Sequence, residues 1–77
     1  MKHTIETRKP FTPQAGRFYV NAGGGRYLCE HVNADGSAWF TNTKSGWHFN
    51  AKGIGVYPDG RIDWDHSVMG RFVEASS

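Results

Sequence analysis

The run Asp63-Trp64-Asp65-His66 is the densest group of chemically useful side chains in the sequence. In an extended strand, Asp63 and Asp65 point to the same face, where paired carboxylates can act as general acid and base or bind a divalent cation. Arg61 falls on that face as well, so the pattern is typical of a solvated row of opposite charges. A catalytic pair also needs a cleft, and a domain this small has little room for one. We therefore predict that the chain is not an enzyme.

The spacing gives little support for metal ligands or nucleophiles. The histidines are scattered along the chain, at His3, His31, His48 and His66. No two have the i, i+4 spacing of zinc ligands on a helix. Cys29 is the only cysteine, which excludes an internal disulfide and a cluster of thiolates within one chain. Gly23-Gly24-Gly25 is not followed by the Lys-Ser/Thr pair of a phosphate-binding loop. The sequence thus predicts no metal, no cofactor and no small-molecule substrate.

Glycines mark the elements that would position these side chains. The pattern Gly-Arg-apolar occurs four times, beginning at Gly16, Gly25, Gly60 and Gly70. Glycine supplies the positive φ that ends a turn, and the next two residues then begin a strand. The strongest turn is Pro58-Asp59-Gly60, which predicts a three-residue hairpin loop. Segments between turns are short and rich in aromatic and β-branched residues, as in an all-β sandwich or barrel.

The turns also predict which residues face one another, because a slip of one residue would turn every side chain to the other face. The predicted cross-strand pairs are Val20–Tyr27, Phe18–Cys29, Val32–Ser37, His31–Ala38, Cys29–Phe40, Asn42–Trp47, Phe40–Phe49, Ala38–Ala51, Val56–Ile62 and Ile54–Trp64. They place one set of residues on a common inner face, namely Phe18, Val20, Tyr27, Cys29, Ala38, Phe40, Trp47, Phe49, Ala51, Ile54, Val56, Ile62 and Trp64.

We expect an all-β fold, a small antiparallel meander of five or six short strands closing into a barrel. A short helical turn over residues 65–70 precedes a last strand, Arg71 to Glu74, whose Phe72 closes the core. This order of elements resembles that of SH3-like barrels, and the resemblance concerns architecture alone. Residues 1–15 contain two prolines and no alternation, which predicts a flexible or loosely docked arm before a single domain over residues 16–77.

Size and composition limit the class of protein. A chain of 77 residues builds one core, and its marginal stability makes dimerisation an open alternative. The hydrophobic fraction of 38% is too high for a disordered chain and too low for a membrane protein. The first ten residues lack the apolar stretch of a signal peptide, so we expect a cytoplasmic protein.

The net charge of +2 is small and unevenly placed. Residues 1–52 carry seven basic and three acidic side chains, whereas residues 53–77 carry two basic and four acidic ones. This asymmetry can steer a polyanion towards one side of the molecule.

The predicted outward side chains form an aromatic patch. In the predicted registers Leu28 lies opposite Tyr19 and Thr41, while Trp39 lies between Glu30 and Asn50. The proposed partner-binding residues are Tyr19, Leu28 and Trp39, with His48, Arg17 and Arg26 at the margin. Exposed aromatic and arginine side chains supply most of the binding energy in protein interfaces. We therefore expect a protein-interaction module, a small regulator or inhibitor that binds a larger protein or a second copy of itself.

Two alternatives stay open for this patch. In one, the arm covers it through Ile5 or Phe11. In the other, the chain binds nucleic acid, with bases stacking on aromatic rings and phosphates held by basic side chains. The residues for that role are Arg17, Arg26, Lys44, Lys52, Tyr19 and Trp39. A charge of only +2 favours a protein partner over nucleic acid.

Overall fold

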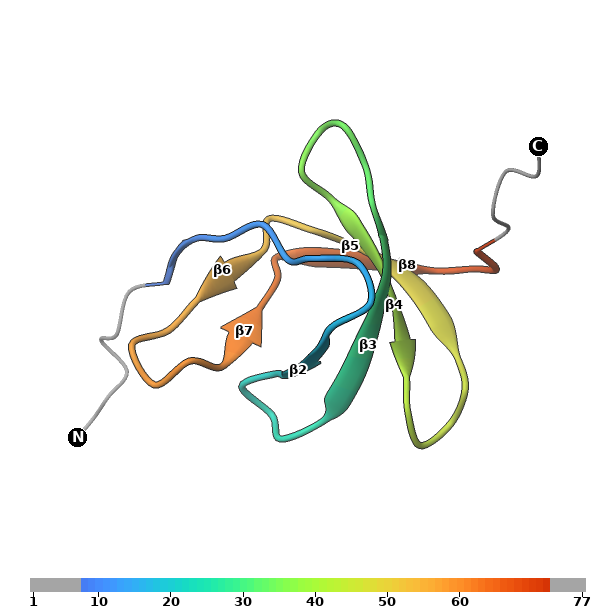
Figure 1. Cartoon of the computed structure of the whole chain (residues 1–77), viewed down its shortest axis with the longest axis horizontal. Coiled ribbons are helices and arrows are strands. Elements are labelled where there is room, and N and C mark those ends of the chain that lie inside the picture. Colours follow the sequence, from blue (N-terminus) through green and yellow to red (C-terminus); the bar gives the residue numbers. More distant parts are fainter. Residues whose placement is uncertain (1–7, 73–77) are drawn as a thin grey trace.

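The computed structural model describes residues 8–72, which form two antiparallel sheets (Figure 1). The strands are β1 (Lys9–Pro10), β2 (Phe18–Val20), β3 (Arg26–Val32), β4 (Ala38–Asn42), β5 (His48–Lys52), β6 (Gly55–Val56), β7 (Ile62–Asp63) and β8 (His66–Met69). The larger sheet has the order β2-β3-β4-β5-β8, and the smaller one has the order β1-β6-β7. No helix occurs among residues 8–72, and the all-β prediction is confirmed.

The central strands pair as the turns predict. Cys29 lies opposite Phe40 in the β3–β4 pair, and Phe40 lies opposite Phe49 in the β4–β5 pair. Val56 faces Ile62 across the Pro58-Asp59-Gly60 turn, where Gly60 adopts a φ of 92°. The position of Gly60 in the left-handed region is therefore confirmed, as is the β4–β5 register, and the predicted β3–β4 register is confirmed as far as Cys29.

The predicted register of β2 is wrong by one residue. Phe18 lies opposite Leu28 and Tyr19 lies opposite Tyr27, so Tyr19 faces the core and Phe18 faces away from it. The cause is a tighter loop than the one we assumed. The Asn21 N–H donates to the Gly25 carbonyl, and Asn21 Oδ1 accepts the Gly25 N–H at 2.9 Å. The asparagine side chain thus closes the loop at residues 21 and 25.

A bulge changes the other end of β3. The register shifts between Cys29 and His31, so that His31 lies opposite Trp39 and Val32 lies opposite Ala38. The predicted His31–Ala38 and Val32–Ser37 pairs are therefore wrong. An extra residue in one strand reverses the alternation beyond it. His31 consequently joins Trp39 on the side facing away from the core, and Val32 packs against the core.

Residues 66–69 form strand β8, and the predicted helical turn is wrong. Val68 lies opposite Asn50 and His66 lies opposite Lys52, which gives the backbone of this segment an antiparallel partner in β5. Arg71 and Phe72 follow outside any strand, and residues 73 and 74 of the predicted last strand lie outside the described residues. Phe72 does not close the core, because its ring packs against His31 and Trp39 instead.

The core lies between the two sheets and is dominated by aromatic rings. Its buried members are Cys29, Ala38, Phe40, Phe49, Ala51, Ile54 and Ile62. The Phe40 ring stacks on Phe49 at 5.7 Å and on Trp64 at 5.5 Å between ring centroids. Three predicted core residues are instead exposed, namely Phe18 at 53%, Val20 at 41% and Trp47 at 64%.

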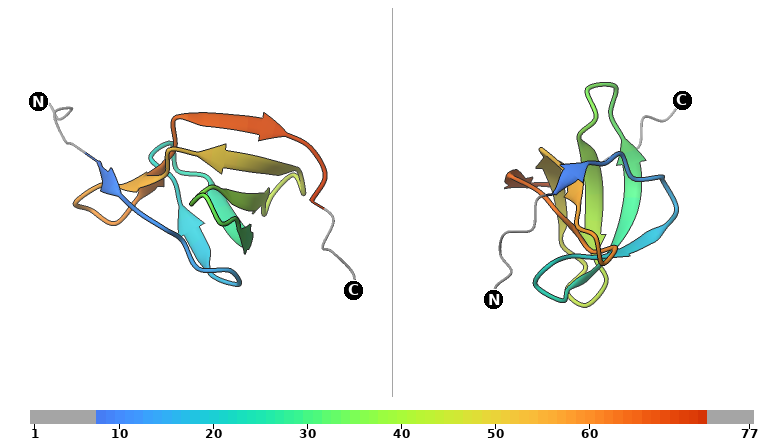
Figure 2. Two further views of the ribbon diagram at one scale, coloured as in Figure 1. Left: turned by 90° about the horizontal axis from the view of Figure 1, so that it is seen from above. Right: turned by 90° about the vertical axis from the view of Figure 1, so that its left-hand side faces the viewer.

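The two sheets are joined without forming a closed barrel. The chain passes from one sheet to the other three times, between β1 and β2, between β5 and β6, and between β7 and β8. A single parallel bridge joins Asn21 to Ile62, where the Ala22 N–H also donates to the Ile62 carbonyl. Figure 2 shows β8 on the far side of the larger sheet from β2.

The segment before β2 packs against the domain. Lys9 and Pro10 pair with β6, and the Phe11 N–H donates to the Ile54 carbonyl. Pro13 is buried, and the Phe11 ring meets Tyr19 edge-on at 5.6 Å between centroids. Residues 1–7 of the predicted arm, including Ile5, lie outside the described part of the chain.

Candidate functional site

The face of the larger sheet that points away from β1, β6 and β7 is the candidate site, and we call it the outer face. The pairing places on it Phe18, Val20, Arg26, Leu28, His31, Trp39, Thr41, His48, Asn50 and Val68. Four predicted partner-binding residues are among them: Arg26, Leu28, Trp39 and His48. Tyr19 is not, because it packs on the opposite side against Phe11 and the core. Phe11 therefore does not cover the outer face.

One end of the outer face presents Phe18 and Arg26 together. The Phe18 ring is 53% exposed, and the Arg26 guanidinium carbon lies 4.8 Å from the ring centroid. Such a cation–π contact holds both side chains in place at the surface. Leu28, directly opposite Phe18, is half-buried beside them. The sequence prediction missed Phe18, and the signal that would have found it is the pair Asn21 and Gly25, four positions apart, which closes a five-residue loop.

The other end of the outer face holds a group of three rings. The His31 and Phe72 rings stack at 5.6 Å between centroids, and the Phe72 ring lies 5.9 Å from Trp39. Gly70 lies next to this group, where a Cβ would be in ordinary van der Waals contact with Trp39, 3.6 Å from Cη2. The bulge in β3 brings His31 into this group, which the sequence did not reveal.

A chain of hydrogen bonds lies beside the first of these ends, because Thr41 lies opposite Leu28 and His48 lies opposite Thr41. Thr41 Oγ1 donates to Glu30 Oε2 at 2.6 Å and lies 2.8 Å from His48 Nδ1. When the single hydroxyl proton goes to the carboxylate, the Thr41 oxygen accepts from His48 in the tautomer that carries a proton on Nδ1. This direction is the reverse of what a threonine nucleophile needs, because His48 would have to accept the hydroxyl proton. These hydrogen bonds therefore order the part of the outer face next to Leu28.

The basic residues considered for nucleic acid do not form one patch. Lys44 lies in the β4–β5 turn, whose Thr43 N–H donates to the Arg26 carbonyl, so these two cations share one end of the sheet. Lys52 lies at the opposite end of β5, across from His66. Arg17 is exposed and precedes β2.

The carboxylates of the Asp63–His66 run have separate partners. Asp65 forms an ion pair with Arg8, and Oδ1 of Asp63 accepts the Trp64 N–H at 2.9 Å. His66 is exposed on β8. Within residues 8–72 no three His, Cys, Asp or Glu side chains are grouped closely enough to hold a metal ion. Cys29 is buried in the core, and this burial raises the pKa of its thiol above the ordinary value.

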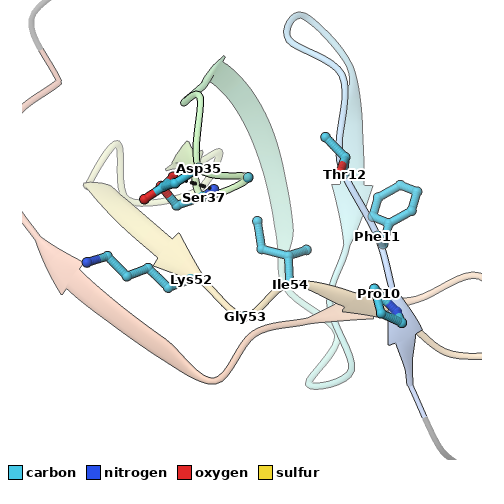
Figure 3. A pocket seen from close by; sticks show the side chains of 9 residues that line it. Pro10, Phe11, Thr12, Asp35, Ser37, Lys52, Gly53 and Ile54 are labelled. Atoms are coloured by element: carbon cyan, nitrogen blue, oxygen red, sulfur yellow. Dashed lines mark hydrogen bonds between the residues drawn. The ribbon is translucent and has the colours of Figure 1, made fainter.

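A shallow hollow of about 490 Å³ lies between the segment before β2, the β3–β4 turn and the end of β5 (Figure 3). Its polar side chains include Asp35, Ser37 and Lys52. The Ser37 hydroxyl donates to Asp35 Oδ1 at 2.6 Å, and the Ser37 N–H donates to the same oxygen at 2.9 Å. These bonds stabilise the turn between β3 and β4. The polar side chains of Asp35 and Ser37 in the hollow therefore have a structural role in this turn.

Comparisons with protein-family models, with curated proteins and with solved structures found no match to this chain. Among the described residues there is also no helix with the length and apolar character needed to cross a membrane. The candidate site therefore depends on the geometry of the outer face alone.

Proposed function

We propose that the chain is a non-enzymatic protein-interaction module whose outer face docks onto a larger protein, as a small regulator or inhibitor would. The observation that carries this proposal is the Phe18 ring, 53% exposed and fixed under the Arg26 guanidinium. Arginine and large aromatic side chains account for most hot-spot energy in protein interfaces. A ring that is already held in one position loses less conformational entropy on binding than a free side chain.

The rest of the outer face supports the same interpretation. Leu28 and Trp39 are half-buried beside more exposed neighbours. Together they give an uneven apolar surface that a partner can contact. The hydrogen-bonded side chains of Glu30, Thr41 and His48 supply polar groups next to Leu28. Protein interfaces combine apolar contact area with direct hydrogen bonds.

A shared architecture with SH3-like barrels is part of the proposal. Continuity of the chain between the two sheets and the Asn21–Ile62 bridge support it. An NMR cross-peak between the Ala22 amide and residue 62 tests the junction in solution, and its absence would argue for two unconnected sheet edges. A cytoplasmic location also stays a prediction.

The experiment that tests the outer face compares matched aromatic variants. The immobilised chain captures partners from extract, and one captured protein is then titrated with purified variants. Phe18→Ala should weaken binding by roughly tenfold or more, as truncating a hot spot does. Trp47→Ala is the control, because Trp47 is 64% exposed and lies outside the outer face. Equal binding by wild type and Phe18→Ala would remove the proposal.

Nucleic acid is the alternative outcome of the same test. Fluorescence anisotropy with single- and double-stranded DNA and RNA at two salt concentrations measures it. Affinity that falls steeply with salt, and that is weakened by both Arg26→Ala and Lys44→Ala, would favour nucleic acid over a protein partner.

A further inference from the structure

Strand β8 leaves one edge of the larger sheet open. The strand order ends on β8, and no other strand among residues 8–72 pairs with its far side (Figure 2). All four residues of β8 are exposed, with Val68 at 62% and Met69 at 58%. A free strand edge with apolar side chains is a template for pairing with another strand. Neither lysine nor proline, which block such pairing, occurs within the strand.

The pairing with β5 defines which backbone groups are free. The Gly70 N–H donates to the His48 carbonyl, and Val68 lies opposite Asn50. Backbone groups of an antiparallel strand face its two neighbours alternately. The N–H and C=O groups of Ser67 and Met69 therefore point to the open edge.

We propose that a second copy of this chain pairs with the open edge, so that two β8 strands join antiparallel about a two-fold axis at Val68. Ser67 of one copy then exchanges hydrogen bonds with Met69 of the other, and Val68 faces its own counterpart. Such an interface is self-complementary, as two-fold symmetry requires. The result is one continuous ten-stranded sheet made from two five-stranded ones.

The charged residues on either side of β8 favour a second copy of this chain as the partner, and they favour the register centred on Val68. A pairing that continues one residue before β8 and two residues beyond it, with the axis at Val68, places Asp65 of each copy opposite Arg71 of the other and gives two opposite-charge pairs by symmetry. Registers centred on Ser67 or Met69 keep the hydrogen bonds but set Asp65 against Met69 or Arg71 against Ser67. The Asp65 side chain is 54% exposed despite its ion pair with Arg8, so it can accept a second cation. Opposite charges directly across a strand pair stabilise it, and like charges destabilise it.

Complementary charge reversal tests the proposal directly. Sedimentation equilibrium from about 10 µM to about 1 mM protein covers the range expected for a small interface. Wild type should approach twice the 8.6 kDa chain mass at the upper end. Arg71→Asp alone and Asp65→Arg alone each set like charges across both ends, which should weaken self-association roughly tenfold or more. An equimolar mixture of the two variants restores both pairs and should dimerise like wild type.

The matched control is Arg61→Asp, which makes the same change of charge at an exposed arginine on the Pro58-Asp59-Gly60 turn. It should leave self-association unchanged. A single 8.6 kDa species at every wild-type concentration would overturn the proposal. So would a mixture of the charge variants that associates no better than either variant alone while circular dichroism shows both to be folded.

A cross-link tests the register without disturbing the charges. Residues at a non-hydrogen-bonded antiparallel position have Cα atoms about 4.5 Å apart, within the range that a disulfide bridges. Val68→Cys should therefore form a disulfide-linked dimer in oxidised glutathione at least about tenfold faster than Val20→Cys, which is exposed on β2. Cys29 does not compete, because it is fully buried. Equal rates for the two variants would contradict the register.

The dimer does not depend on the proposed function of the outer face. Phe18→Ala should dimerise like wild type, and Arg71→Asp should still bind the larger partner. A dimer that is lost in Phe18→Ala would place the contact on the outer face and overturn the β8 pairing.

Discussion

The two faces of the larger sheet are made by the same strands and differ in almost every property. On the inner face of β4, Phe40 is fully buried and stacks on two other rings. On the outer face, Trp39 is half-buried and Phe18 is 53% exposed. Because side chains alternate along a strand, neighbouring residues can serve stability and binding separately. The comparison predicts that substitutions on the inner face mainly lower stability, whereas substitutions on the outer face mainly weaken binding.

Phe40→Ala should have the largest effect. Truncating a buried phenylalanine removes its packing and leaves a cavity, at a cost of about 3–5 kcal/mol in the free energy of unfolding. A domain of 77 residues is stabilised by roughly 4–12 kcal/mol in total, so this loss removes a large share of its stability. Phe18→Ala is the matched control on the outer face, with an expected change of about 0.5 kcal/mol. Urea denaturation measures the stability of both variants. Equal denaturation midpoints for Phe40→Ala and Phe18→Ala would contradict the assignment of stability to the inner face.

Gly60→Val should come next, because it strains the backbone without touching either face. Gly60 has a φ of 92°, and a Cβ built there meets no atom within 4 Å. The cost is therefore that of holding a residue with a Cβ in the left-handed region, about 1–2 kcal/mol. A thermal melt measures it. An unchanged melting temperature would show that the turn adopts another conformation in solution.

Trp39→Ala should have a smaller effect on stability and a larger one on binding. The ring packs on Phe72 over Gly70 and does not enter the core, so we expect a loss of about 1 kcal/mol or less. Partner affinity should fall roughly tenfold, as for other aromatic hot spots. If melts show Trp39→Ala to be more destabilising than Gly60→Val, Trp39 belongs to the core and the assignment of the faces is wrong.

The sequence predicts the centre of the sheet better than its edges. Around β4, turn residues and an alternating pattern predict the register with β5 correctly, and they predict the register with β3 correctly as far as Cys29. Two local events escape the pattern: the Asn21 side chain that tightens the loop after β2, and the extra residue at Glu30. Each involves a single residue, yet each reverses the faces beyond it. The aromatic candidate site inherited both errors, which is why Tyr19 entered it while Phe18 and His31 did not.

The helical turn expected over residues 65–70 was wrong for a different reason. The local sequence of residues 65–70 does not show that β5 offers a free strand edge with which they can pair. Once that edge exists, pairing His66–Met69 with it satisfies backbone groups that a single helical turn would leave to water. The open edge on the other side of β8 is thus a product of tertiary structure, and sequence patterns alone could not reveal it.

The smallest expected effect is on the pH dependence of folding, and it arises in a turn that belongs to neither face. Hydrogen bonds from the Ser37 hydroxyl and N–H hold the pKa of Asp35 below its ordinary value of 3.8. A carboxyl with a lowered folded-state pKa stabilises the fold above its unfolded pKa and loses that contribution as the pH falls through the folded pKa. Wild type should therefore lose stability below about pH 4 more steeply than Asp35→Asn does. Urea denaturation at a series of pH values measures the two slopes. The difference in stability between Phe40→Ala and Phe18→Ala should stay constant over the same range, because protonating Asp35 alters the turn that carries both faces equally. Identical slopes for wild type and Asp35→Asn would mean that the Ser37 hydrogen bonds do not persist in solution.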